Sequence, residues 1–86
     1  SLEKQLQIAA REGNLDAMRD ALEKGADINA VKPDEPALFN ATLAGRVDAV
    51  KFLLERGAQV DICNTKSCTP LMTAGEYGRL EIIEIL

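Results

Sequence analysis

The sequence predicts an all-α repeat solenoid, built from stacked helix-turn-helix units. Gly25–Asn29 reads Gly-Ala-Asp-Ile-Asn, and Gly57–Asp61 repeats this pattern as Gly-Ala-Gln-Val-Asp, 32 residues later. Five further sets of positions keep spacings of 32 and 33 residues, which is typical of a repeat architecture. Aromatic residues make up only 3% of the chain, so the core must consist of aliphatic side chains, which suit closely packed helices better than a β-sandwich.

Each unit is expected to contain two short helices, because apolar residues recur at helical spacing on either side of a glycine. The glycine ends the first helix, and in the first unit Asn14 can cap the second. The equivalent positions are Leu6, Leu38 and Leu71; Ala9, Ala41 and Ala74; Gly13, Gly45 and Gly78; Leu15, Val47 and Leu80; and Met18, Val50 and Ile83.

Small side chains in the first helix of each unit give the predicted stack its curvature. Ala9, Ala41 and Ala74 allow neighbouring first helices to approach closely, whereas the second helices carry bulkier residues. We therefore expect a concave face on the side of the first helices.

Polar segments separate the units. Residues 30–35 and 62–68 combine turn-forming residues with β-compatible neighbours, which predicts projecting, β-hairpin-like loops. The resulting units are residues 1–30, an N-terminal capping repeat, then 31–63, then 64–86, a repeat truncated in its second helix. We therefore expect the chain to be a fragment of a longer array.

The repeated motifs resemble those of the ankyrin repeat family. Thr69–Ala74 (Thr-Pro-Leu-Met-Thr-Ala) is similar to the family's Thr-Pro-Leu-His-x-Ala, and the two Gly-Ala segments are similar to its Gly-Ala-Asp-Val-Asn. The resemblance covers residues 6–86. It implies a stack that binds other proteins through a continuous groove, formed by the loops and the ends of the first helices.

The sequence departs from the family pattern at several positions. Gln7, Phe39 and Met72 replace the motif histidine, so the family's Thr–His hydrogen-bond ladder cannot form as usual. We expect Phe39 and Met72 to fill the space that the missing histidines leave. Pro36 stands where a capping threonine is expected, and Asp34 and Ser67 occupy loop positions that are usually glycine.

The predicted groove supplies the candidate protein-binding residues. Tyr77 is the strongest candidate, because tyrosine offers a large, stiff contact surface with a polar tip. Leu43 is an apolar residue at a groove position. Phe39, Ala44, Cys68 and Met72 also fall along the groove. The full set of predicted protein-binding residues is Arg11, Glu12, Lys32, Asp34, Glu35, Leu43, Thr65, Lys66, Glu76 and Tyr77.

Composition argues against several other functions. The net charge of −4 offers no basic surplus for nucleic acid, and no apolar run is long enough to span a membrane. Without histidine, the chain lacks the commonest general base and metal ligand, so we expect no catalytic residue, no metal and no cofactor. Cys63 and Cys68 flank a turn and could approach disulfide distance, but reduced thiols are the simpler interpretation. A cytoplasmic or nuclear location is expected.

The sequence therefore predicts a non-catalytic protein–protein interaction module. Two alternatives remain open. The chain could be a regulatory or substrate-recruiting segment of a larger multidomain enzyme. It could also be a scaffold that associates with itself through an uncapped C-terminal edge, where Ile82 and Ile85 are expected to lack cover.

Overall fold

A glycine ends the first helix of each predicted unit, and the chain reverses its direction there. In the computed structural model, which describes residues 1–86, Gly13, Gly45 and Gly78 have φ angles of 73°, 73° and 65°. Glycine adopts these left-handed values at little steric cost. The six helices are α1 (Leu2–Glu12), α2 (Leu15–Glu23), α3 (Ala37–Leu43), α4 (Val47–Glu55), α5 (Pro70–Glu76) and α6 (Leu80–Ile85).

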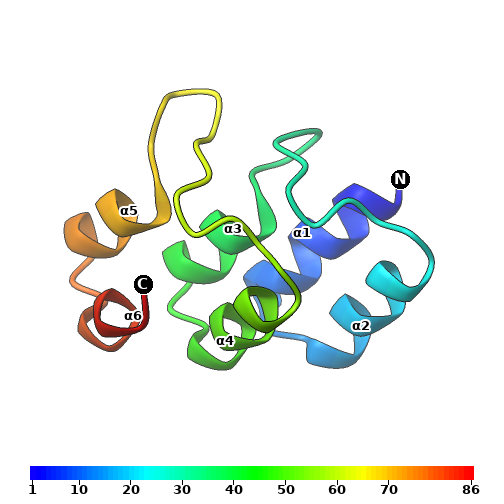
Figure 1. Cartoon of the computed structure of the whole chain (residues 1–86), viewed down its shortest axis with the longest axis horizontal. Coiled ribbons are helices and arrows are strands. Elements are labelled where there is room, and N and C mark those ends of the chain that lie inside the picture. Colours follow the sequence, from blue (N-terminus) through cyan, green and yellow to red (C-terminus); the bar gives the residue numbers. More distant parts are fainter.

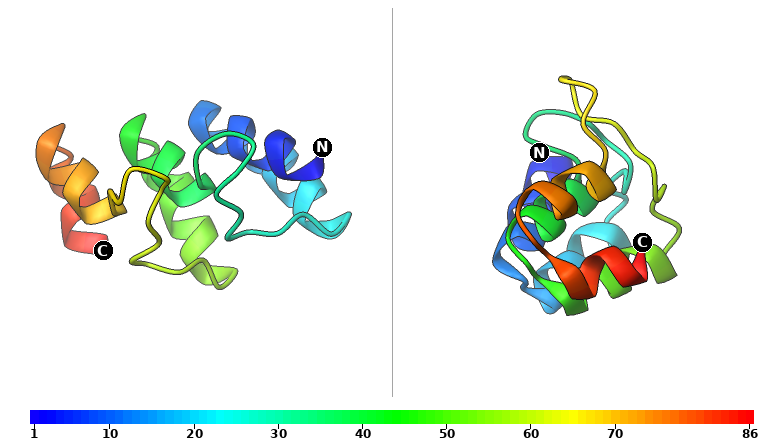
Figure 2. Two further views of the ribbon diagram at one scale, coloured as in Figure 1. Left: turned by 90° about the horizontal axis from the view of Figure 1, so that it is seen from above. Right: turned by 90° about the vertical axis from the view of Figure 1, so that its left-hand side faces the viewer.

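The helices form three pairs, α1–α2, α3–α4 and α5–α6, which stack side by side along the long axis of the molecule (Figure 1). The first helices α1, α3 and α5 form one layer, and α2, α4 and α6 form the other (Figure 2). The two long loops project from the layer of first helices, and the chain termini lie toward opposite ends of the stack (Figure 1). The predicted all-α solenoid is confirmed.

Buried alanines determine how the pairs stack. Ala9, Ala41 and Ala74 are at most 3% exposed, and the first helices pack against one another more extensively than the second helices do. Their carbonyls also complete the turns, because each accepts a hydrogen bond from the residue after the turn glycine. These bonds are Asn14 N–H to Ala9 (2.9 Å), Arg46 N–H to Ala41 (2.8 Å) and Arg79 N–H to Ala74 (2.8 Å).

Polar side chains cap the N-termini of helices where the sequence places such a residue just before the helix. Asn14 Oδ1 accepts from the backbone N–H of Ala17 at 3.1 Å, and Thr69 Oγ1 accepts from that of Met72 at 3.2 Å. By contrast, Pro36, which precedes α3, provides no side-chain cap, as the sequence predicts. The start of α3 instead depends on packing, since Pro36 is fully buried.

The loops form turns but no β-strands. In the second loop, the backbone N–H of Asn64 donates to the carbonyl of Cys68 at 3.1 Å, and Ser67 has a φ of 63° where the family pattern has glycine. This backbone pair places Asn64, rather than Cys63, opposite Cys68. Both cysteines are free thiols, and the expected hairpin is limited to its tip.

The predicted orientation of α6 is wrong. Ile82 was expected to lack cover, but it is 1% exposed, whereas Leu80 is 73% exposed. Ile82 lies beside Gly45 and Val47 at the boundary with the preceding pair, and Ile85 is only partly exposed. Ile82 and Ile85 therefore do not form an uncovered edge. The exposed apolar residues of the third pair include Leu71 and Leu80 instead.

Equivalent leucines at two positions of the stack should differ sharply in their contribution to stability. Leu38 is 1% exposed between two neighbouring pairs, whereas Leu71 is 53% exposed. We expect Leu38→Ala to lower the free energy of unfolding by about 2–5 kcal/mol, because it leaves a cavity in the core. Leu71→Ala should lower it by less than about 1 kcal/mol. Urea unfolding of the two variants measures both free energies. A similar loss of stability in both variants would contradict the burial of Leu38 and the exposure of Leu71.

Candidate functional site

Two boundaries between neighbouring helix pairs lie beneath the projecting loops. We call the boundary between α1 and α3 the first seam, and the boundary between α3 and α5 the second seam. Gln7 and Arg11 on α1 occupy the same repeat positions as Phe39 and Leu43 on α3. The same backbone arrangement therefore carries polar side chains at the first seam and apolar side chains at the second.

Polar contacts close the first seam. Gln7 is 1% exposed, and its Nε2 donates to the carbonyls of Ala30 and Lys32, both at 3.1 Å. Its Oε1 accepts from the backbone N–H of Asp34 at 3.0 Å. The guanidinium of Arg11 forms an ion pair with the carboxylate of Asp34. The loop is thus held against α1 by hydrogen bonds from Gln7 to its backbone and by the Arg11–Asp34 ion pair.

The second seam is open. A hollow of about 410 Å³ lies between α3 and α5, beneath the second loop. Phe39 and Leu43, both half-buried, provide apolar side chains, and Tyr77 is 52% exposed. The complete lining is Glu35, Phe39, Leu43, Asn64, Lys66, Cys68, Thr73, Glu76 and Tyr77.

Asn64 organises the loop above this hollow. Its Oδ1 accepts from the backbone N–H groups of Lys66 and Cys68, both at 2.9 Å, and its Nδ2 donates to Glu35 Oε2 at 2.8 Å. These bonds join the second loop to the end of the first one. The loop side of the hollow is therefore held in place by a side chain that is itself 9% exposed.

The charged side chains of the hollow have no ionic partner within the protein. The three ion pairs of the structure join Arg11 to Asp34, Arg19 to Asp16, and Lys24 to Asp20, and none involves the hollow. Glu35 accepts only the bond from Asn64. The lining thus presents the carboxylates of Glu35 and Glu76 and the single ammonium group of Lys66.

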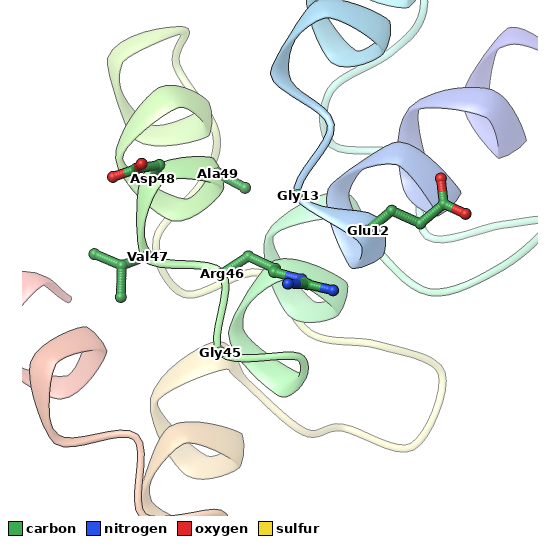
Figure 3. Close-up of a pocket in the computed structure, with 7 residues that line it drawn as sticks. All are labelled: Glu12, Gly13, Gly45, Arg46, Val47, Asp48 and Ala49. Carbon is green, nitrogen blue, oxygen red and sulfur yellow. The ribbon is translucent and has the colours of Figure 1, made fainter.

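A second hollow, at the helix-to-helix turns, is a packing feature. Figure 3 shows Arg46 extending from the α3–α4 turn toward Gly13, while Val47 and Asp48 point away from it. Arg46 Nε donates to the carbonyl of Arg11 at 3.0 Å. A Cβ atom on Gly13 would lie only 3.0 Å from Arg46 Cδ, so the glycine also makes room for this arginine. Arg46 therefore ties the α3–α4 turn to the end of α1.

Arg79 repeats this contact one pair further along the stack. Its Nη2 donates to the carbonyl of Leu43 at 2.8 Å, and it packs against Gly45. The contact fixes the end of α3, whose Leu43 side chain lines the hollow. Neither Arg46 nor Arg79 was singled out from the sequence. Their repeated role could have been found from the Gly-Arg pairs at 45–46 and 78–79, which stand 33 residues apart.

The structure separates the predicted binding residues into groups. Five of them line the hollow at the second seam: Glu35, Leu43, Lys66, Glu76 and Tyr77. Arg11 and Asp34 pair with each other at the first seam, Lys32 and Thr65 are exposed on the two loops, and Glu12 lies at the hollow around Arg46.

Three further residues of this region were either expected along the groove, as Met72 and Phe39 were, or missed, as Asn64 was. Met72, which was expected to fill the space of a missing histidine, is 60% exposed, and its sulfur accepts from the backbone N–H of Thr69 at the start of α5. Phe39 lines the hollow. Asn64 was missed because no repeat position marks it, and its role depends on a contact with Glu35, 29 residues away.

Gln7 should be essential to the first seam. We expect Gln7→Leu to lower the free energy of unfolding by about 2–3 kcal/mol, because it removes three hydrogen bonds and leaves partly buried loop groups unpaired. Gln5→Leu, at an exposed position of the same helix, should change it by no more than about 0.5 kcal/mol. Urea unfolding compares the two variants, and equal stabilities would show that Gln7 does not hold the loop.

Comparison with known proteins places the chain within a described family. Residues 6–86 match the family model described as ankyrin repeats, in three copies. No curated protein matches the chain. None of its helices combines the length and apolar character needed to cross a membrane. The structure gathers no group of three or more acidic or cysteine side chains suited to holding a metal ion.

Proposed function

The chain belongs to the ankyrin repeat family, and on that premise we propose that it binds a segment of another protein in the hollow at the second seam. Ankyrin repeats are generally protein–protein interaction modules. The observation that carries the proposal is the contrast between the seams. At the first seam, Gln7 and Arg11 form contacts within the protein, whereas at the second seam Phe39 and Leu43 leave the hollow available to a partner.

The chemistry of the hollow suits a protein partner. Tyr77 and Leu43 contribute apolar surface to its lining, and aromatic side chains are enriched among residues that dominate binding energies. The carboxylates of Glu35 and Glu76 and the ammonium group of Lys66 share the lining with this surface, and protein interfaces commonly combine an apolar centre with a polar rim. A contact here would bury the apolar part and leave the rim to set specificity.

The size of the hollow favours a short segment over a broad protein surface. Its 410 Å³ falls within the range of about 300–1,000 Å³ found for sites that enclose small ligands. One or two side chains of a partner fit such a volume. The partner we propose is therefore an extended or turn segment, with anchoring side chains that enter between α3 and α5.

The proposed role is non-catalytic, with no cofactor and no nucleic acid partner. Ankyrin repeat domains are typically interaction modules, and this chain has a net charge of −4 and no histidine. We place the protein in the cytoplasm or nucleus, where its two cysteines would remain reduced.

Substitutions in the hollow should abolish binding without unfolding the protein. Peptides selected from a randomised displayed library against the wild-type chain supply the probe. We expect Leu43→Glu and Tyr77→Ala each to weaken the selected peptides by about tenfold or more, because truncating or charging a central apolar contact costs over about 1.4 kcal/mol. Fluorescence anisotropy measures the affinities, and thermal unfolding verifies the fold.

Leu71→Glu is the matched control, since Leu71 is an exposed leucine outside the hollow. It should leave peptide affinity within about twofold of wild type. Selected peptides that bind the Leu43→Glu variant normally, or a library that yields no binders, would refute this site.

A further inference from the structure

We infer that the partner segment enters the hollow with an arginine side chain, which meets the unpaired carboxylates of its lining. The inference rests on the proposed function and adds to it the chemistry of the partner. Its starting point is the Arg11–Asp34 pair, in which an arginine meets a carboxylate beneath the first loop.

At the first seam, an arginine at the end of α1 reaches a carboxylate on the first loop. Arg11 and Asp34 are 23 residues apart and meet only because the loop folds over the helix. The position equivalent to Arg11 on α3 is Leu43, which carries no charge. The second seam therefore lacks a resident arginine, although Glu35 on the loop side and Glu76 on α5 supply carboxylates.

The unpaired charges favour a cation. Glu35 and Glu76 have no ion-pair partner, and Lys66, the one basic residue of the lining, forms no ion pair with either. The lining thus carries two negative charges and one positive charge, on a chain whose net charge is −4. A cationic side chain is attracted by this arrangement, whereas an acidic or phosphorylated one meets two carboxylates for a single ammonium group.

Arginine fits the hollow better than lysine does. Its planar guanidinium can form paired hydrogen bonds with a carboxylate and can also stack on an aromatic ring, here Tyr77. Its aliphatic stem can lie along Phe39 and Leu43, the apolar residues of the lining. A lysine ammonium provides the charge but neither the stacking nor the paired hydrogen bonds.

Four peptide mixtures test the inference directly. Each is a randomised heptapeptide mixture with one fixed central residue: arginine, citrulline, lysine or leucine. Citrulline keeps the shape of arginine without its charge. We expect the arginine mixture to bind the wild-type chain at least about fivefold more tightly than the citrulline mixture, with lysine between them. The preference for arginine should shrink as the salt concentration rises from about 50 to about 500 mM, because salt screens the attraction between exposed charges.

Charge-neutralising variants identify the residues involved. Glu76→Gln and Glu35→Gln should each weaken the arginine mixture by about three- to tenfold and leave the leucine mixture within about twofold. Glutamine at position 35 can still accept the hydrogen bond from Asn64, so the loop is retained. Glu23→Gln, which removes the same charge from an exposed site on α2, is the control and should change neither. Lys66→Ala should tighten the arginine mixture.

The outcomes separate this inference from the proposed function. The leucine or citrulline mixture could bind as tightly as the arginine mixture and lose binding in the Leu43→Glu variant. That result would keep the hollow as the binding site but overturn the inference that an arginine enters it. Unchanged arginine binding in both glutamine variants would overturn it as well. Failure of all four mixtures to bind in a manner sensitive to Leu43→Glu would refute the proposed site itself.

Discussion

The close approach of the first helices is the constraint on which the rest of the structure depends. Ala9, Ala41 and Ala74 bring these helices together, and their carbonyls complete the turns that follow. One small residue per unit thus sets the spacing between pairs and the geometry of the chain reversal. A larger side chain at any of these buried positions would separate the helices and deform both seams.

With this spacing set, the seams differ because of a few side chains at equivalent positions. Gln7 and Arg11 satisfy the first loop and close the first seam, whereas Phe39 and Leu43 leave the second open and apolar. The backbone repeats, so the difference comes from side-chain chemistry alone. A repeat protein can in this way devote one boundary to internal stability and the next to contact with a partner.

The opposite side of the stack supports the open seam. Arg79 donates to the carbonyl of Leu43 and packs against Gly45. These contacts fix the backbone at the end of α3, while the Leu43 side chain lines the hollow. On the loop side, Asn64 holds Glu35 and the second loop together. The hollow therefore lies between contacts that fix both of its sides, which reduces the ordering cost of binding.

The sequence by itself determined the features that neighbouring residues encode. The repeat period, the turn glycines, the cap at Asn14 and the alanine positions depend on hydrogen bonds and spacing within a few residues, so pattern alone predicts them. It also named Glu35, Leu43 and Tyr77 among the residues of the hollow.

Only the tertiary structure decided which groove residues are free and which are engaged. Arg11 meets Asp34, Gln7 holds the first loop and Asn64 holds Glu35 across 23 to 29 residues of chain, and Ile82 rather than Leu80 faces the core. Such contacts depend on how separate segments are oriented in space. Local sequence preference constrains each segment but leaves that orientation to the packing of the whole stack.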